Sequence, residues 1–126
     1  MTSSTRDADL HVLLEEVDEN RVVRYVTEGV LRASHRKLDE APWDNLGLPY
    51  QRSFEGDKTP LPTDTPAELV LDLHPTSTVF NAGHRIRVTI MGADADNTES
   101  TGAPNPTIAV YHSQTHPSHI TLPTVP

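Results

Sequence analysis

The stretch "LHPTSTVFNAGHRIRVTI", Leu73 to Ile90, decides the fold class of this chain. Apolar and polar residues alternate on both sides of the turn-forming "NAG", residues 81–83, where glycine can adopt the positive φ that a corner requires. His74 and His84 flank this corner. No further side chain converges on the two rings in the sequence. We therefore interpret the stretch as a corner between two strands and not as a metal pair or a catalytic arrangement.

Alternation with a period of two dominates the rest of the chain as well. Residues 8–15 predict a first strand, "DEN" at 18–20 a turn, "RVVRYV" a hairpin partner and "GVLRASH" a third strand. About seven short strands separated by turn signals favour an all-β fold, a β-sandwich. The residues that we expect to face inward are Ala8, Leu10, Val12, Leu14, Leu69, Leu71, Leu73, Ile86, Val88, Ile90, Ile108, Val110, Ile120 and Leu122.

Length and composition agree with a single domain over residues 1–126. A chain of 126 residues buries roughly two thirds of its unfolded surface. Aromatic residues make up only 5% of the chain, so the core must consist mainly of Val, Ile and Leu. Eleven Pro and six Gly suit short strands better than long helices. The best helical candidate, around Arg36–Glu40, is too short to be stable alone.

Charge and cysteine content exclude several function classes. A net charge of −8 with scattered Lys and Arg disfavours both nucleic-acid binding and docking on anionic lipid. The chain has no cysteine, which excludes thiol catalysis and disulfides. It has neither an apolar run of about 20 residues nor a basic-then-apolar signal peptide. We therefore expect a cytoplasmic protein without nucleic-acid or membrane partners.

No catalytic, cofactor-binding or metal site is predicted. A nucleophile elbow requires G-x-S-x-G, which the chain lacks. His112, His116 and His119 would share one face of a helix, but Pro117 and strand-like flanks interrupt that helix, so a structural role is favoured. The group Asp94, Asp96 and Asn97 lacks the spacing of a calcium loop, so we interpret it as a solvated acidic loop.

A long irregular segment, residues 36–66, interrupts the strand pattern. Connections of this length without secondary structure are uncommon inside a compact domain. The segment contains the aromatic residues Trp43, Tyr50 and Phe54, so we expect it to pack on another surface.

Three signatures, in order along the chain, resemble one known family. They are "SSTRDADLHVLLEEVDENRVVRYVTEGVLRASHR", "LVLDLHPTSTVFNAGHRIRVTI" and "VYHSQTHPSHITLPTVP". Together they are similar to the C-terminal non-catalytic domain of the X-prolyl dipeptidyl peptidase and cocaine esterase family. The resemblance implies a jelly-roll β-sandwich of the galactose-binding-like type with two long loops. It also implies packing against an α/β-hydrolase domain that carries the Ser-His-Asp residues. None of the family's catalytic residues maps onto this chain.

The resemblance also implies that the first strand or strands of the family domain are missing here. An unpaired sheet edge would result, and proteins normally cover or charge such edges. Either a longer hydrolase chain or a second chain would supply the cover, and self-association through this edge is one possibility.

Two classes of function follow. The leading hypothesis is an accessory domain of a serine esterase or X-prolyl dipeptidyl peptidase, with Trp43, Tyr50 and Phe54 as candidate domain-docking residues. An equally open interpretation is that these aromatics seal the end of their own sandwich. The alternative class is a free-standing carbohydrate-binding or self-associating β-sandwich module.

Overall fold

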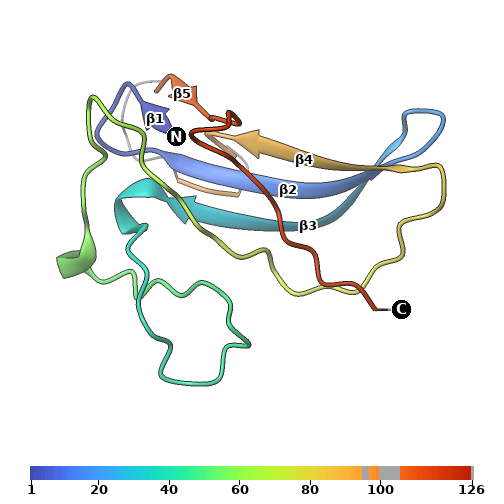
Figure 1. Cartoon of the computed structure of the whole chain (residues 1–126), viewed down its shortest axis with the longest axis horizontal. Coiled ribbons are helices and arrows are strands. Elements are labelled where there is room, and N and C mark those ends of the chain that lie inside the picture. Colours follow the sequence, from blue (N-terminus) through green and yellow to red (C-terminus); the bar gives the residue numbers. More distant parts are fainter. Residues whose placement is uncertain (95–96, 100–105, 126) are drawn as a thin grey trace.

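The chain is mostly β-structure, arranged in two small antiparallel sheets (Figure 1). The computed structural model describes residues 1–94, 97–99 and 106–125. In the larger sheet the strand order is β3-β2-β4, with β2 at Asp9–Val17, β3 at Val23–Arg32 and β4 at Arg85–Met91. The smaller sheet pairs β1, Thr2–Ser3, with β5, Ile108–Ala109.

Helical structure in the described residues is limited to two 3-10 turns, η1 at Ala33–His35 and η2 at Glu55–Asp57. No helix in the described part of the chain combines the length and the apolar character that crossing a membrane requires.

The hairpin β2–β3 forms as its sequence predicts. Asp18 begins the connecting turn, and its carboxylate accepts a hydrogen bond from the Val22 N–H at 2.7 Å. Arg21 adopts a positive φ of 68° in the same turn. The two predicted strands "RVVRYV" and "GVLRASH", however, form one continuous strand. Because β2 supplies a pairing partner as far as Arg32, β3 continues through Gly29 and ends only where η1 begins.

The predicted inward residues are buried: Ala8, just before β2, and Leu10, Val12 and Leu14 within it. The opposite face of this central strand is also covered, and His11 and Glu15 are only 3% and 7% exposed. Beyond the end of the sheet, a small core cluster joins segments that are distant in sequence. Its members are Ala8, Ala33, Leu61 and Ala67.

The segment 67–80 is not a strand, contrary to the prediction for "AELVLDLHP". Its Leu69, Leu71 and Leu73 are only half-buried. The segment crosses the sheet close to Gly29, where an added Cβ would lie 2.2 Å from the carbonyl oxygen of Asp72. Alternation predicted the side-chain directions, but a strand also needs a neighbour with a continuous row of backbone partners. Backbone contact with β3 is instead local, at the hydrogen bond from the His74 N–H to the Glu28 carbonyl at 2.8 Å.

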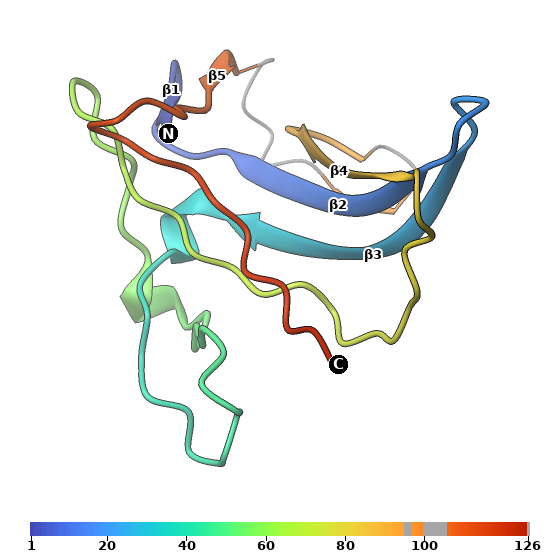
Figure 2. The same ribbon diagram turned by 45° about the vertical axis from the view of Figure 1, so that its right-hand side comes forward.

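Two further strand predictions need correction. The inward set of β4 is exposed, at 51% for Ile86, 41% for Val88 and 42% for Ile90, because the described segments do not cover this face of β4. The predicted strand "SHITLP" is irregular, and its Ile120 is 39% exposed. Figure 2 shows the C-terminal segment descending past the larger sheet without joining it.

Candidate interaction surface

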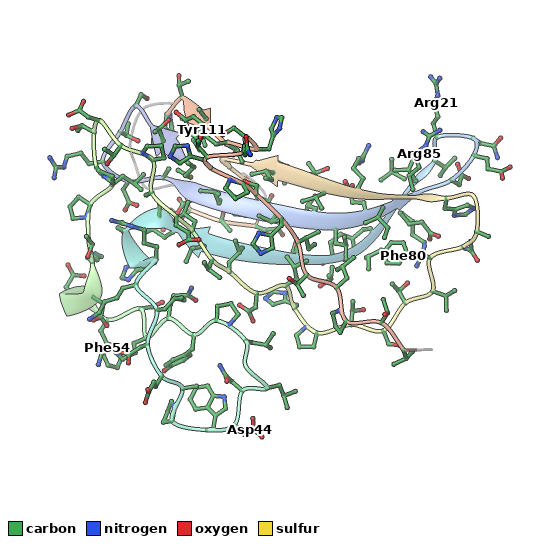
Figure 3. The ribbon with its side chains drawn as sticks, in the orientation of Figure 1. Arg21, Asp44, Phe54, Phe80, Arg85 and Tyr111 are labelled. Atoms are coloured by element: carbon green, nitrogen blue, oxygen red, sulfur yellow. The ribbon has the colours of Figure 1, made fainter. Side chains whose placement is uncertain are left out.

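The aromatic loop, residues 38–54, extends away from both sheets. It follows η1 and returns to the body through η2. Figure 3 shows Asp44 at the far tip of this loop and Phe54 near its return to the body.

Backbone and side-chain hydrogen bonds fasten the base of the loop to the body. The Arg36 guanidinium donates to the carbonyl of Ala33 at 3.0 Å and to the carbonyl of Thr59. The Thr59 N–H in turn donates to the Ser34 carbonyl at 2.8 Å. Leu61, only 1% exposed, anchors the returning chain in the core. The loop therefore begins and ends at fixed positions.

A buried carboxylate clamps the two sides of the loop together. Asp57 is 7% exposed and accepts hydrogen bonds from the Arg52 guanidinium at 2.6 and 3.0 Å. It also accepts one from the Lys37 ammonium at 3.1 Å. These donors, Arg52 first, lower the pKa of Asp57 to about 2. Arg52 also pairs with Asp39 at 2.8 Å, so one guanidinium joins both sides of the loop.

A tight turn closes the tip of the loop. Leu46 and Gly47 both have positive φ, 59° and 75°. The side chain of Asn45 donates to the Leu48 carbonyl at 2.5 Å and accepts from the Gly47 N–H at 3.3 Å. The Asp44 carboxylate accepts from the Leu46 N–H at 3.0 Å. The polar side chains at the tip thus bond to the loop itself.

The apolar side chains of the loop are directed to solvent. Trp43 is 60% exposed and Phe54 is 63% exposed. Trp43 packs edge-on against the half-buried Tyr50, with 5.1 Å between ring centroids, and the Arg52 guanidinium lies 5.4 Å from the centroid of Phe54. We define the apolar loop surface as Leu38, Trp43, Leu46, Leu48 and Phe54, all of which are exposed.

A shallow hollow of ≈ 280 Å³ lies between the loop and the neighbouring segment, bordered by Trp43, Tyr50 and Asp72. Of the three predicted docking residues, the structure brings Trp43 and Tyr50 into contact and leaves Phe54 beside Arg52. The sequence analysis missed the leucines that extend the surface. The clustering of Leu46 and Leu48 in "DNLGLP", a turn sequence, was the available signal for two of them.

The corner at residues 81–84 is held by Glu16, which the sequence analysis also missed. The buried Glu16 carboxylate accepts from the Asn81 N–H at 2.8 Å, contacts His84 Nδ1 at 2.8 Å and pairs with the Arg24 guanidinium. The Asn81 N–H, Arg24 and His84 together lower the pKa of Glu16 to about 2.

His74, by contrast, is exposed. A turn at residues 82–83 does lead into β4, but the segment before it is not a strand, so the interpretation as a corner between two strands is correct only for its second half. The sequence did contain a signal for the role of Glu16: this carboxylate stands at the next position on the apolar face of residues 8–14.

The remaining candidates from the sequence are the three C-terminal histidines and the acidic group Asp94, Asp96 and Asn97. His112, His116 and His119 are exposed, and His116 lies against the ring of Tyr111 with 5.6 Å between centroids. Asp96 lies outside the described residues. Within residues 1–94, 97–99 and 106–125, no group of three or more His, Asp or Glu side chains could hold a metal ion.

Comparison with known proteins decides the family. Residues 1–122 match the family described as the X-Pro dipeptidyl-peptidase C-terminal non-catalytic domain. The chain belongs to this family. The resemblance inferred from the three sequence signatures is thereby confirmed. The X-Pro dipeptidyl-peptidase C-terminal domain is a non-catalytic domain of hydrolase enzymes, which agrees with a chain that lacks a nucleophile elbow.

Two curated relatives of this family member are much longer proteins. They carry the names "Putative serine esterase Mb1866c", from Mycobacterium bovis, and "Putative serine esterase MT1883", from Mycobacterium tuberculosis. Each is 43% identical over 126 residues, and the alignment covers 99% of this chain. The chain spans only 20% of the length of either relative. No solved structure matches the chain.

Proposed function

We propose that this chain is the accessory, non-catalytic part of an α/β-hydrolase-type serine esterase or X-prolyl dipeptidyl peptidase. Its apolar loop surface packs on the catalytic domain and forms part of the wall of the substrate cleft. The observation that carries this proposal is a fixed loop that exposes five large apolar side chains, Leu38, Trp43, Leu46, Leu48 and Phe54.

General features of protein interfaces support this role for the loop. Aromatic and arginine side chains contribute most to binding when a partner excludes water around them. Trp43, Phe54 and Arg52 lie in this one loop, and leucines surround Trp43 in the sequence. Exposed apolar patches on small proteins commonly mark interaction sites, and five exposed apolar side chains lie in this one loop.

The same proposal extends to the fold. Within the described residues, the smaller sheet consists of β1 and β5, two residues each. We propose that residues 1–126 are a single domain whose jelly-roll sandwich is completed by strands of a longer protein. Such strands would pair with the smaller sheet and give segment 67–80 a neighbouring strand.

Carbohydrate binding is the alternative, and one observation favours it. The hollow beside Trp43 and Tyr50 combines aromatic rings with polar side chains, which is the composition of many sugar sites. Against it, Asp44 and Asn45 already hydrogen-bond to the loop backbone. Binding to a glycan array that Trp43→Ala abolishes would favour this alternative over the accessory role.

A chimeric esterase tests the accessory role. The segment of the Mycobacterium tuberculosis relative that matches this chain is replaced by the chain itself, and hydrolysis of a p-nitrophenyl ester is measured. We expect an active chimera. The double variant Trp43→Ala/Phe54→Ala should lower its activity and its melting temperature, because the two domains then lose their main apolar contact.

Tyr25→Ala is the matched control, because Tyr25 is a comparably exposed aromatic residue, at 54%, on β3 and outside the loop. The control should leave both readouts unchanged. Equal effects of the two variants, or no effect of the double variant in an active chimera, would contradict docking through the apolar loop surface.

A further inference from the structure

The outer edge of β4 is unpaired within the described residues. β4 pairs with β2 on one side through seven consecutive residue pairs, from His11↔Met91 to Val17↔Arg85. No described backbone group outside the larger sheet hydrogen-bonds to residues 85–91. The edge of β3, in contrast, receives the hydrogen bond from His74.

This edge has few of the features by which proteins usually protect a free strand. Natural edge strands are commonly short, contain Pro or a bulge, or carry charged side chains, Lys above all. β4 is seven residues long, "RIRVTIM", and contains neither Pro nor Lys; its charged residues are Arg85 and Arg87, of which Arg87 is paired with Glu15. Its pairing with β2 shows no register shift. Such a strand is well suited to receive another strand.

An apolar row accompanies the free edge. Ile86, Val88 and Ile90 lie on one face of β4, and each is at least 41% exposed. The pairs Val12↔Ile90 and Leu14↔Val88 place this row next to buried residues of β2. A strand added beside β4 would therefore extend an existing apolar face.

The sequence of β4 is complementary to itself. Val88 is its middle residue, so antiparallel pairing about Val88 aligns all seven residues with a second copy. Val88 then faces Val88, and Ile86 faces Ile90, which forms a continuous apolar row. On the other face Arg87 is opposite Thr89 and Arg85 is opposite Met91. No arginine faces an arginine.

Alternative registers are less favourable. Pairing centred on Arg87 or Ile86 would set arginine directly against arginine, and like charges directly opposite each other are destabilising. Pairing centred on Thr89 would place Ile86 opposite Gly92, outside the strand. In addition, Glu15 already binds Arg87, at 2.8 and 3.0 Å, so the positive charge nearest the axis is neutralised within each copy.

We propose that two copies of this chain associate through antiparallel pairing of β4 with β4, centred on Val88, into one continuous sheet of six strands. The proposal is independent of the accessory role, because β4 and the aromatic loop are different surfaces. A single strand pair buries less area than a standard stable interface, so we expect a dimer of modest affinity that dissociates on dilution.

Charge variants at Val88 test the pairing by sedimentation velocity of the purified chain across a concentration series. Val88→Glu or Val88→Lys places two like charges at the two-fold axis and should raise the dissociation constant by roughly tenfold or more. An equimolar mixture of the two variants should restore the dimer, because Glu then faces Lys. Val79→Glu is the control, since Val79 is 76% exposed and lies outside β4.

Single-cysteine variants test the register in a chain that has no cysteine of its own. Val88→Cys should form a disulfide-linked dimer under mild oxidation, because directly opposite residues lie within disulfide reach. Ile86→Cys alone should not form one, whereas its mixture with Ile90→Cys should. Circular dichroism verifies that each variant keeps its β-structure.

Three outcomes would overturn the proposal. One is a wild-type chain that stays monomeric over the whole concentration range. Another is a dimer that Val88→Glu leaves intact or that Val79→Glu weakens equally. The last is efficient self-crosslinking by Ile86→Cys with none by Val88→Cys.

Discussion

Glu16 connects the middle strand of the larger sheet to the corner at residues 81–84. It lies on the same face as Leu14, yet it is a carboxylate with 2% exposure. Burial of a carboxylate is tolerated only where donors surround it, and here Asn81, Arg24 and His84 do so. One acidic side chain thus fixes the position at which β4 begins.

The pKa of Glu16 predicts the acid sensitivity of the fold. Its value of about 2 lies below the ordinary 4.5, so the ionised carboxylate stabilises the folded state fully above about pH 4.5. This stabilisation is lost as the pH falls from 4.5 toward 2. In Glu16→Gln the amide nitrogen turns a donor toward another donor, either Arg24 or the Asn81 N–H. We expect the melting temperature at pH 7 to fall by about 5 °C or more.

Thermal unfolding between pH 7 and pH 2.5 checks this expectation. The melting temperature of Glu16→Gln should depend less on pH than that of the wild type. Glu68→Gln is the control, because Glu68 is exposed and outside the cluster, and it should follow the wild-type curve. Parallel pH curves for Glu16→Gln and the wild type would contradict the assignment.

At the level of elements, segment 72–74 passes β3 at a glycine. Gly29→Ala would set its Cβ against the Asp72 carbonyl oxygen, so segment 72–74 or β3 must shift. We expect a loss of about 1–3 kcal/mol in the free energy of unfolding, measured by urea denaturation. Gly56→Ala is the matched control, because an added Cβ there meets nothing within 4 Å. Equal stabilities of the two variants would show that this crossing is not tightly packed.

The elements that the sequence predicted well are those whose partner is near in the chain. The hairpin β2–β3 has a local turn and matching alternation, so its register follows from residues 9–32. Segment 67–80 has equally regular alternation but no adjacent strand, and alternation alone does not supply one. Alternation likewise predicted that the side chains of Ile86, Val88 and Ile90 share one face of their strand, but it could not predict their exposed fractions. Exposure depends on what covers the sheet.

At the scale of the whole molecule, Trp43 reports whether the apolar loop surface is free. It is the only tryptophan, and its side chain is 60% exposed. We expect the fluorescence of the isolated chain to be quenched by acrylamide nearly as readily as that of a free tryptophan analogue. In the chimeric esterase, with the tryptophans of the remaining sequence replaced by Phe, the emission should shift to shorter wavelength and quenching should weaken. A blue-shifted, quencher-resistant Trp43 in the isolated chain would contradict a free docking surface.

The candidate surface was only partly predictable from the sequence. Aromatics in a long loop predicted Trp43, Tyr50 and Phe54 as docking residues, and of these Trp43 and Phe54 belong to the exposed surface, whereas Tyr50 is half-buried. The clamp around Asp57 was not predictable, since its partners Lys37 and Arg52 come together only when both sides of the loop are in place. The family itself was recognisable from three separated signatures in the correct order, which the match over residues 1–122 confirms.

The clamp at Asp57 has a further consequence for association. A flexible loop must give up conformational freedom when it binds, at roughly 0.5–1.5 kcal/mol for each side chain that becomes immobilised. Because Asp57 holds Lys37 and Arg52 before any partner arrives, much of this entropic penalty has already been met during folding. The loop is pre-organised. Covering Trp43 and Phe54 therefore costs less backbone entropy than it would in a flexible loop.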